Sequence, residues 1–398
     1  VTTNSPNNFT IANTLGGGID WDTNIKTATF SANPGRGYIV NTTSGEVTLN
    51  LPAGVPGNIV AVQDYAGTFD TNNLIISANG SEKIQARSTD AKSTTENASI
   101  YLLYQDATRG WTADNIIDNP PTFNVNYLVI SGAGGGGFGA GGGGGAGGLR
   151  TSYGSTTGGG ANAESTLTLS PSTNYTVTIG AGGAGSTSSS ANGSNGSNSV
   201  FASITSTGGG GGGTRGAAGY NGSAGGSGGG EAGDNSGSGG AAVTSPVVQG
   251  YAGGSHNTSG TGAAGGGSAY EIGNGHSGNS GGNGGAGLAV SITGSSVTYA
   301  AGGGGGGQNG SNAGSGGTGG GGNGGTSGAG SAGTVNTGSG GGGDGNLDNS
   351  GGTGGSGVVI LRYPNTYTIS GLSGTTTTSG SDKITTFTNA GTGNIQFN

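Results

Sequence analysis

The stretch GGGGTRGAAGYNGSAGGSG, residues 210–228, places a glycine at every third position. The same spacing occurs in residues 136–148, 275–287 and 316–328. A period of three belongs neither to the α-helix nor to the β-strand. It is the period of the polyproline-II conformation, which has three residues per turn and rises about 3.1 Å per residue. The pattern therefore predicts a bundle of polyglycine-II helices.

Collagen and flexible linkers are also rich in glycine, but neither fits this chain. Collagen needs an unbroken Gly-X-Y repeat and abundant proline, whereas this sequence has 9 Pro and its phase breaks often. A Gly/Ser linker has no use for bulky residues, yet bulky residues recur at the ends of the glycine runs. They are Leu149, Tyr220, Tyr270, Leu288, Tyr299 and Val358. We therefore expect an ordered scaffold.

Order in such a scaffold requires that its helices lie side by side. A polyproline-II helix makes no internal hydrogen bonds, so each amide must bond to a neighbouring helix, and a Cβ would hold the backbones apart. Fixing a residue costs about 1–2 kcal/mol of backbone entropy, and each hydrogen bond returns a net of about 0.5–1.5 kcal/mol. Because these quantities nearly cancel, we expect sheets or neighbouring subunits to clamp the bundle, and a homotrimer or longer fibre as the assembly.

The chain reads as three mostly β segments with essentially no α-helix. Residues 1–119 alternate apolar and polar positions between frequent turn signals, which predicts a β-sandwich or small barrel. Pro120-Pro121 marks a boundary. Residues 122–364 form the glycine-rich domain with flanking strands, and residues 365–398 a small C-terminal β unit. The expected core of the first segment is Phe30, Tyr38, Val40, Val47, Leu49, Leu51, Ile59, Val62, Leu74, Ile76, Leu102, Tyr104 and Trp111.

Composition narrows the function classes. The 398 residues include no Cys, only 7% are charged, and the net charge is −8. Arg150 and Arg215 are the only basic residues in the glycine-rich stretch, so nucleic-acid binding is not expected. No apolar run approaches the roughly 20 residues of a membrane helix. The absence of Met, even at position 1, suggests a processed product or a segment of a longer protein. This composition is typical of an extracellular fibrous or virion protein.

The sequence offers little chemistry. Strings resembling GxGxxG carry no information in a chain this rich in glycine, and no Gly-Lys-Ser/Thr phosphate loop occurs. The two histidines, His256 and His276, lie in Gly/Ser/Asn loops without a triad pattern, so we expect no enzyme, cofactor or metal. Exposed loop or subunit-contact histidines are one interpretation, and a metal site on a subunit axis is the other. Asp20, Asp22, Asp64 and Asp70 are either turn caps or calcium ligands.

Aromatic and aliphatic residues in the loops between glycine runs are the best candidates for recognition. Tyrosine offers a large contact area at low entropy cost. The alternative is that these side chains pack over the ends of the bundle. The receptor-contact candidates, most of them in loops 241–257 and 268–276, are Tyr220, Val247, Val248, Tyr251, His256, Tyr270, Ile272 and His276.

Several motifs carry a family resemblance. IDWDT (19–23), GYIVNTTSG (37–45), TLNLPAG (48–54) and YQDATRGW (104–111) resemble a small β module of phage tail-fibre proteins, especially of marine phages. NYLVISGAGGGG (126–137), NYTVTIGAGGAG (174–185) and GGSGVVILRYP (354–364) resemble the glycine-rich module of phage fibres and some bacterial surface proteins. The architecture is also distantly similar to the polyglycine-II tip adhesin of T-even-like phages.

The resemblance implies a virion-surface fibre that attaches to a host-cell protein or glycan by non-covalent recognition, alongside other virion tail proteins, without membrane insertion. A structural fibril or capsid-decorating protein without a receptor is the alternative. An ice-binding protein is a further alternative, because small polyglycine-II bundles with one flat face bind ice. The absence of cysteine and the attached fibre module argue against it.

Overall fold

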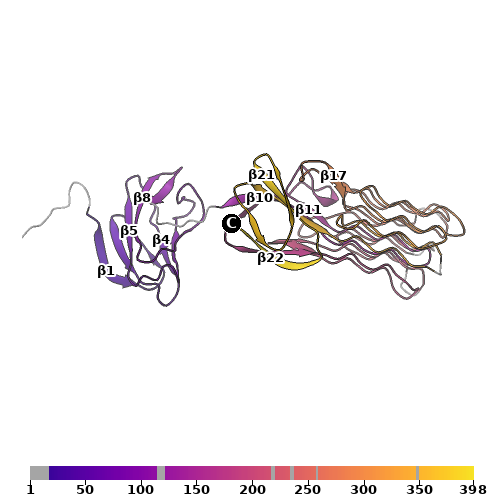
Figure 1. Cartoon of the computed structure of the whole chain (residues 1–398), viewed down its shortest axis with the longest axis horizontal. Helices are drawn as coiled ribbons and strands as arrows, with labels where there is room; N and C mark the ends of the chain where they lie inside the picture. Colours follow the sequence, from indigo (N-terminus) through magenta and orange to yellow (C-terminus); the bar gives the residue numbers. More distant parts are fainter. Residues whose placement is uncertain (1–17, 114–121, 217–219, 234–236, 257–258, 347–348) are drawn as a thin grey trace, which may run out of the picture. The chain divides into compact units, whose positions relative to one another are not determined.

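The computed structural model describes residues 18–113, 122–216, 220–233, 237–256, 259–346 and 349–398. The chain forms two compact units, Val1–Pro121 and Thr122–Asn398, each built almost wholly of strands and extended segments (Figure 1). Within the described ranges the helical elements reduce to one 3-10 turn, η1 (Gly158–Gly160). The mostly β fold expected from the sequence is therefore confirmed.

The first unit contains two facing sheets. The five-stranded sheet has the order β1-β3-β5-β8-β9, and the four-stranded sheet has the order β2-β4-β6-β7. Of the two architectures expected, the structure has separate sheets around a shared core and not a closed barrel, as far as residues 18–113 show. The strands are β1 (Asp20–Lys26), β2 (Phe30–Ser31), β3 (Arg36–Val40), β4 (Val47–Asn50), β5 (Ile59–Asp64), β6 (Leu74–Ser77), β7 (Ala91–Ser93), β8 (Ser99–Asp106) and β9 (Gly110–Ala113).

The first six strands alternate between the two sheets and pair in parallel. Strand β3 lies between β1 and β5, and β4 lies between β2 and β6, all in parallel register. The chain therefore winds as a coil through β1 to β6. Strands β7, β8 and β9 then add to the sheets by antiparallel pairing. Alternating apolar positions define which face of a strand is buried but not which strand lies beside it. The coil was therefore not predicted from the sequence.

The core of the first unit is largely the one expected. Eleven of the thirteen expected core residues are buried, among them the fully buried Trp111, Val62 and Leu49. Phe30 is only partly buried, and Ile59 is wrong, since 37% of it is exposed. Side chains alternate along β5, so Val60 and Val62 share the inner face and Ile59 lies on the outer one.

The second unit combines two large sheets with a small hairpin. Their orders are β11-β10-β18-β21-β20, with β12 also paired to β10, then β15-β14-β13-β22-β19, and β16-β17. The strands are β10 (Phe123–Ile130), β11 (Leu149–Thr151), β12 (Leu167–Leu169), β13 (Asn174–Ile179), β14 (Ser199–Phe201), β15 (Ile204–Ser206), β16 (Leu288–Val290), β17 (Val297–Tyr299), β18 (Val358–Pro364), β19 (Ile369–Gly371), β20 (Thr375–Ser379), β21 (Asp382–Phe387) and β22 (Gly391–Phe397).

Residues 365–398 do not stand apart from the glycine-rich domain. Strand β21 pairs with β18, and β22 pairs with β13, both antiparallel. The aromatic side chains of Phe387 and Phe397 are buried in the same apolar cluster as Val177 and Leu361. The segment that we expected as a small β unit of its own therefore contributes two central strands to the sheets that hold the bundle.

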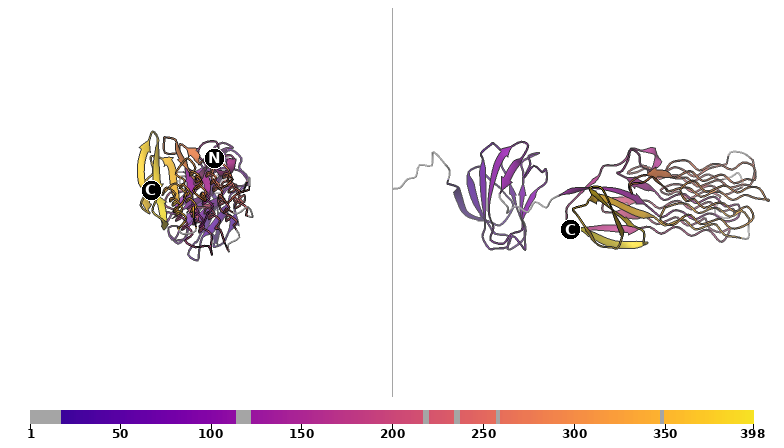
Figure 2. Two further views of the ribbon diagram at one scale, coloured as in Figure 1. Left: turned by 90° about the vertical axis from the view of Figure 1, so that its right-hand side faces the viewer. Right: turned by 45° about the horizontal axis from the view of Figure 1, so that its top comes forward.

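Glycine segments run side by side from these sheets to a set of loops at the other end of the second unit (Figures 1 and 2). We call that end the distal end, and the end next to the sheets the sheet end. Strands lead directly into the bundle: β10 ends at Ile130, β11 begins after Gly148, and β18 begins after Gly357. The strands therefore hold the ends of the glycine helices, as predicted, because the chain runs directly from one into the other.

Residues 141–148 form an interior helix of the bundle. Its successive amides donate in turn to three neighbouring segments, which are 207–213, 264–267 and 338–344, with N···O distances of 2.8–3.0 Å. Its carbonyls accept from three others, which are 131–137, 227–230 and 303–306. Six neighbours reached with a period of three are the hydrogen-bonding pattern that polyglycine-II packing requires.

The close approach of these backbones explains the need for glycine. A Cβ added to Gly142, Gly143 or Gly144 would lie 2.0 Å from a carbonyl oxygen of a neighbouring helix. Such a contact is far inside van der Waals distance, so a side chain there would have to displace a whole helix. The interior of the bundle therefore consists of backbone, not of packed side chains.

Asparagine takes the place of a missing neighbour on the outside of the bundle. In the run NGSNGSN, residues 192–198, the amide oxygens of Asn192, Asn195 and Asn198 accept from the backbone N–H groups of an adjacent glycine segment at 2.8–3.0 Å. A side-chain amide has the same donors and acceptors as a peptide group. The three-residue spacing places these asparagines on one side of their helix.

Replacing Asn195 by alanine is expected to lower the unfolding free energy by about 1–2 kcal/mol. The change removes the bonds of its side chain to Gly211 N at 2.8 Å and to Ala224 O at 3.1 Å. Hydrogen exchange at the Gly211 amide measures the local loss. Asn312→Ala is the matched control, because Asn312 is exposed and its side chain has no hydrogen bond to the described residues; equal effects of both changes would contradict this role for Asn195.

Candidate functional site

The eight receptor-contact candidates do not form one patch. Tyr220, His256 and His276 lie toward the distal end, where Tyr220 O accepts from Ala232 N. The other five candidates lie at the sheet end, since Leu149 N bonds to Gln249 O and Tyr251 N bonds to Ser268 O. These five are Val247, Val248, Tyr251, Tyr270 and Ile272. Loops adjacent in the sequence lie at opposite ends because each glycine segment crosses the whole bundle.

At the sheet end, two of the candidates pack against the chain itself. A Cβ on Gly159 would lie 2.1 Å from Val248 Cγ1, and one on Gly160 would lie 2.6 Å from the hydroxyl of Tyr251. Both side chains are half-buried over η1. Packing over the bundle end, the alternative given above, is therefore what Val248 and Tyr251 do in this structure.

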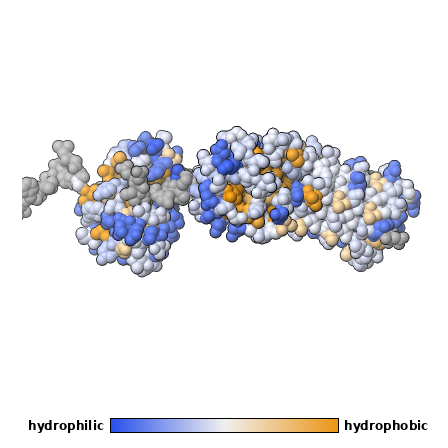
Figure 3. Space-filling model, in the orientation of Figure 1, coloured by the Kyte–Doolittle hydropathy of each residue, from blue (hydrophilic) through white to orange (hydrophobic). Residues whose placement is uncertain are grey.

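Tyr270 and Ile272 differ from their neighbours in being open to solvent. They are 55% and 57% exposed, on the short turn in which the Ser268 hydroxyl accepts from the backbone of Tyr270 and Glu271. Strongly hydrophobic residues are few on the face of the bundle seen in Figure 3. This pair is thus a small apolar spot at the sheet end.

The distal end gathers several short loops. Described parts of it include residues 138–140, 187–191, 308–311 and 326–328, and segments level with them bond to one another, as in Gly307 N to Gly325 O. Asp344 is fully buried there and fixes the first loop, because its carboxylate accepts from Gly139 N and Asn346 N, each at 3.1 Å. The loops are polar and rest on a scaffold whose interior helix, residues 141–148, bonds to six neighbouring segments.

A buried group of titratable side chains lies just below the distal loops. Glu231 and His276 are both fully buried, whereas His256 is half-exposed. His256 Nδ1 lies 3.3 Å from Glu231 Oε2, and His276 Nε2 lies 3.7 Å from Glu231 Oε1. Among the described residues, Glu231 Oε1 and both ring nitrogens of His276 have no hydrogen-bond partner. The expectation of an exposed loop position does not hold for His276.

Burial shifts both buried groups toward their neutral forms. It raises the pKa of Glu231 above 4.5, against a smaller lowering by the bond to His256, and it lowers the pKa of His276 below 6.5. For Glu231 the folded chain binds the proton more tightly than the unfolded one, so its contribution to stability falls as pH rises above 4.5. For His276 the contribution is lost as pH falls below 6.5.

Glu231→Gln is expected to raise the unfolding free energy at pH 7 by about 1 kcal/mol, because a neutral amide replaces a buried charge whose one oxygen has no partner. The decline of stability above pH 4.5 should disappear in this variant. Thermal unfolding between pH 4 and pH 8 measures both effects. Glu271→Gln, an exposed glutamate of the same bundle, is the control, and a stability loss in Glu231→Gln at pH 7 would contradict this account.

Of the four aspartates considered as turn caps or calcium ligands, Asp22 and Asp64 cap turns by accepting from backbone N–H groups. Asp20 instead pairs with Arg36, and Asp70 accepts from the Thr71 hydroxyl. The carboxylate of Asp64 accepts from the backbone N–H groups of Ala66, Gly67, Phe69 and Asn97 at 3.1–3.3 Å. Asp22 forms an ion pair with Lys26 at 2.9 Å. Within the described ranges, no group of three or more His, Cys, Asp or Glu side chains can hold a metal ion.

The described residues contain no helix long and apolar enough to cross a membrane. No curated protein matches this sequence. The model of one protein family, described as a glycine-rich domain, matches residues 112–364. That match spans the strand β10, the whole bundle and the strand β18, and it covers more than half of the 398 residues. The chain therefore belongs to the glycine-rich domain family.

Proposed function

We propose that this chain is a virion tail-fibre or adhesin protein that attaches to a host-cell surface by non-covalent recognition, with the distal loops as its contact surface. One observation carries the proposal: short loops gather at the end of the bundle away from the sheets, on a scaffold whose interior helix bonds to six neighbours. Binding residues are often placed on loops that a rigid scaffold positions.

The chemistry of the distal end suits recognition without catalysis. Its described loops are short and rich in Ser, Asn and Gly, which supply adaptable hydrogen bonds, and Tyr220 adds an aromatic ring. Sequence changes in the loops should affect the bundle little, because the bundle is stabilised by contacts between its own backbones. The resemblance of the N-terminal motifs to phage tail-fibre modules supports the same function.

The proposal includes an assembly and a place. The expected assembly is a homotrimer or longer fibre that contacts other virion tail proteins, with the protein on the virion surface, outside the cell. The expected receptor is a host-cell surface protein or glycan. Neither nucleic acid nor membrane insertion enters the mechanism, and no cofactor is needed for it.

Binding of the labelled full-length chain to bacteria from its source sample tests the proposal. A distal variant carries Tyr220→Ser and His256→Ser, and a matched sheet-end variant carries Tyr270→Ser and Ile272→Ser. We expect saturable binding that the distal variant loses and the sheet-end variant keeps. Loss confined to the sheet-end variant would move the contact surface to Tyr270 and Ile272.

A structural fibril or capsid-decorating protein is the second candidate. The packing of Val248 and Tyr251 over the sheet end favours it, because those side chains serve the bundle and not a partner. No saturable cell binding by the intact assembled protein would support this candidate against the adhesin. Thermal hysteresis of the same sample tests the ice-binding alternative.

A further inference from the structure

The outer face of the five-stranded sheet in the first unit carries a row of exposed apolar side chains. Along β8 every second residue faces outward, and Tyr101 and Leu103 are 56% and 39% exposed. The neighbouring β5 adds Ile59, which pairs with Leu103 and is 37% exposed. This face is therefore not covered by the core of its own unit.

The same row becomes polar toward the β8–β9 turn. Gln105 Nε2 donates to Thr112 Oγ1 at 3.1 Å, and the Thr112 hydroxyl donates to Leu103 O at 3.1 Å. These bonds hold the Gln105 amide in place while its oxygen stays free of any bond to the described residues. The Arg109 side chain, at the turn, likewise has no ion pair or hydrogen bond within residues 18–113 and 122–398 as described.

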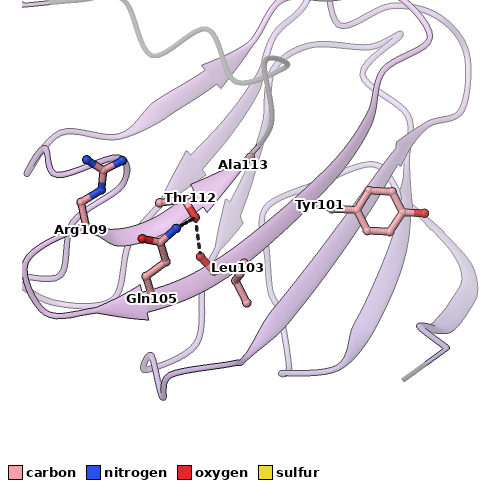
Figure 4. Close-up of a pocket in the computed structure, with 6 residues that line it drawn as sticks. All are labelled: Tyr101, Leu103, Gln105, Arg109, Thr112 and Ala113. Atoms are coloured by element: carbon pink, nitrogen blue, oxygen red, sulfur yellow. Dashed lines mark hydrogen bonds between the residues drawn. The ribbon is translucent and has the colours of Figure 1, made fainter. Parts of the chain in front are cut away.

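A shallow groove of about 400 Å³ is lined by the side chains of β8 and β9 and their turn, namely Tyr101, Leu103, Gln105, Arg109, Thr112 and Ala113. Figure 4 shows Tyr101 toward one end of β8, Gln105, Thr112 and Arg109 toward the other, and Leu103 between them. Tyr101 and Gln105 are four residues apart, which is about 13 Å along a strand. The groove is thus longer than a single sugar ring. Along its length it offers an aromatic face, then a fixed amide and then an unpaired cation.

We infer that this groove binds an acidic oligosaccharide. The ring of Tyr101 presents the negative face of its π system, on which the C–H face of a pyranose stacks. The Gln105 amide and the Thr112 hydroxyl match sugar hydroxyls, since both kinds of group donate and accept. The unpaired guanidinium of Arg109 fits a sugar carboxylate, which it binds with two parallel hydrogen bonds.

Charge favours this occupant over other polymers. Arg109 is the one cation among the six residues that line the groove. A nucleic acid needs several phosphate contacts, whereas a single carboxylate needs one guanidinium. The inference goes beyond the proposed function, because this groove lies in the first unit and the distal loops lie in the second.

Titration of the full-length chain with two acidic probes, trigalacturonate and 3′-sialyllactose, tests the inference. Their neutral partners are the carboxyl-reduced trimer and lactose. Isothermal calorimetry should show each acidic probe binding about tenfold more tightly than its neutral partner, a difference of about 1.4 kcal/mol, because a hydrogen bond to a charged group is stronger than one to a neutral group. Saturation-transfer NMR should place the sugar C–H groups against an aromatic ring.

Two surface variants locate the site. Arg109→Gln should abolish the preference for the acidic probes, and Tyr101→Ala should weaken acidic and neutral probes alike by about fivefold. Tyr65→Ala, a tyrosine that is 58% exposed outside the groove, should change nothing. Circular dichroism checks that each variant is folded.

Three results would overturn the inference: no saturable binding of either acidic probe, equal affinity for acidic and neutral partners, or binding that neither groove variant weakens. Failure here leaves the cell-binding experiment unaffected, because the distal variant carries both of its changes in the second unit. Loss of cell binding in the distal variant with retained sugar binding would conversely separate the two surfaces.

Discussion

Gly143→Ala is expected to unfold the glycine bundle or to destabilise it by about 3–5 kcal/mol, a loss at the upper end of what single substitutions cause. The new Cβ would lie 2.0 Å from Gly303 O and 2.5 Å from Gly303 C. Both are backbone atoms of a neighbouring helix, so no rotamer change relieves the clash. Moving that helix would break its own hydrogen bonds, among them Gly303 N to Gly144 O at 2.9 Å.

The matched control makes the same chemical change where the backbone is open. A Cβ on Gly328 meets no atom within 4 Å, so Gly328→Ala should be neutral, or stabilising by about 0.4–1 kcal/mol through the unfolded chain. Both Trp residues of the sequence, Trp21 and Trp111, lie in the first unit. Their fluorescence therefore follows that unit alone, while hydrogen exchange of glycine amides follows the bundle. Similar stabilities of Gly143→Ala and Gly328→Ala would contradict the packing described above.

Arg150→Met is expected to lower the unfolding free energy of the second unit by about 3–5 kcal/mol, because it leaves a buried carboxylate without its partner. The side chains of Arg150 and Glu164 are 9% and 14% exposed. They pair through two hydrogen bonds, of which Arg150 Nε to Glu164 Oε1 is 2.9 Å. A third bond runs from Arg150 Nη1 to Thr205 O at 3.2 Å, so the cation also joins β11 to β15.

The double variant Arg150→Met/Glu164→Leu distinguishes two costs: the loss of the Arg150–Glu164 attraction, and the burial of the Glu164 carboxylate without a partner. Because apolar residues of similar volume can replace a buried pair at little cost, the double variant should recover most of the stability that Arg150→Met loses. Chemical denaturation at pH 7 measures both, with glycine-amide exchange as the readout for the second unit. A double variant as unstable as the single one would show that Arg150 matters through its bond to Thr205 and not through its charge.

The sequence predicted the bundle because the signal was steric and periodic. Only glycine permits backbones to approach as closely as those around residues 141–148, and only a three-residue period repeats that contact once per turn. The flanking strands β10 and β18 were also visible, as short apolar segments on either side of the glycine-rich stretch. The hairpins β14–β15 and β16–β17 were not predicted; a turn at Ala202 (φ 50°) and another at Gly294 (φ 95°) reverse the chain there.

The candidate site was less predictable than the fold. Loop residues such as Val247 and Tyr270 were chosen for their type, and type does not say at which end of a bundle a loop lies. One feature of the sequence does indicate an outer helix of the bundle. In NGSNGSN, residues 192–198, asparagine recurs with the glycine period, which places the asparagines on one side of the helix. Glu231 was too isolated in the sequence to be nominated, although the fold brings it between the two histidines.

By itself, then, the sequence determined the conformation of each segment: polyglycine-II where glycine recurs every third residue, and strand where apolar residues alternate. Only the tertiary structure decided which segments became neighbours, including the parallel coil of the first unit, the union of residues 365–398 with the glycine-rich sheets, and the burial of His276 beside Glu231. The physical reason is that backbone amides and carbonyls are the same in every residue. Their period fixes the local geometry, but the choice of partner depends on loop lengths and on where the few large side chains find room.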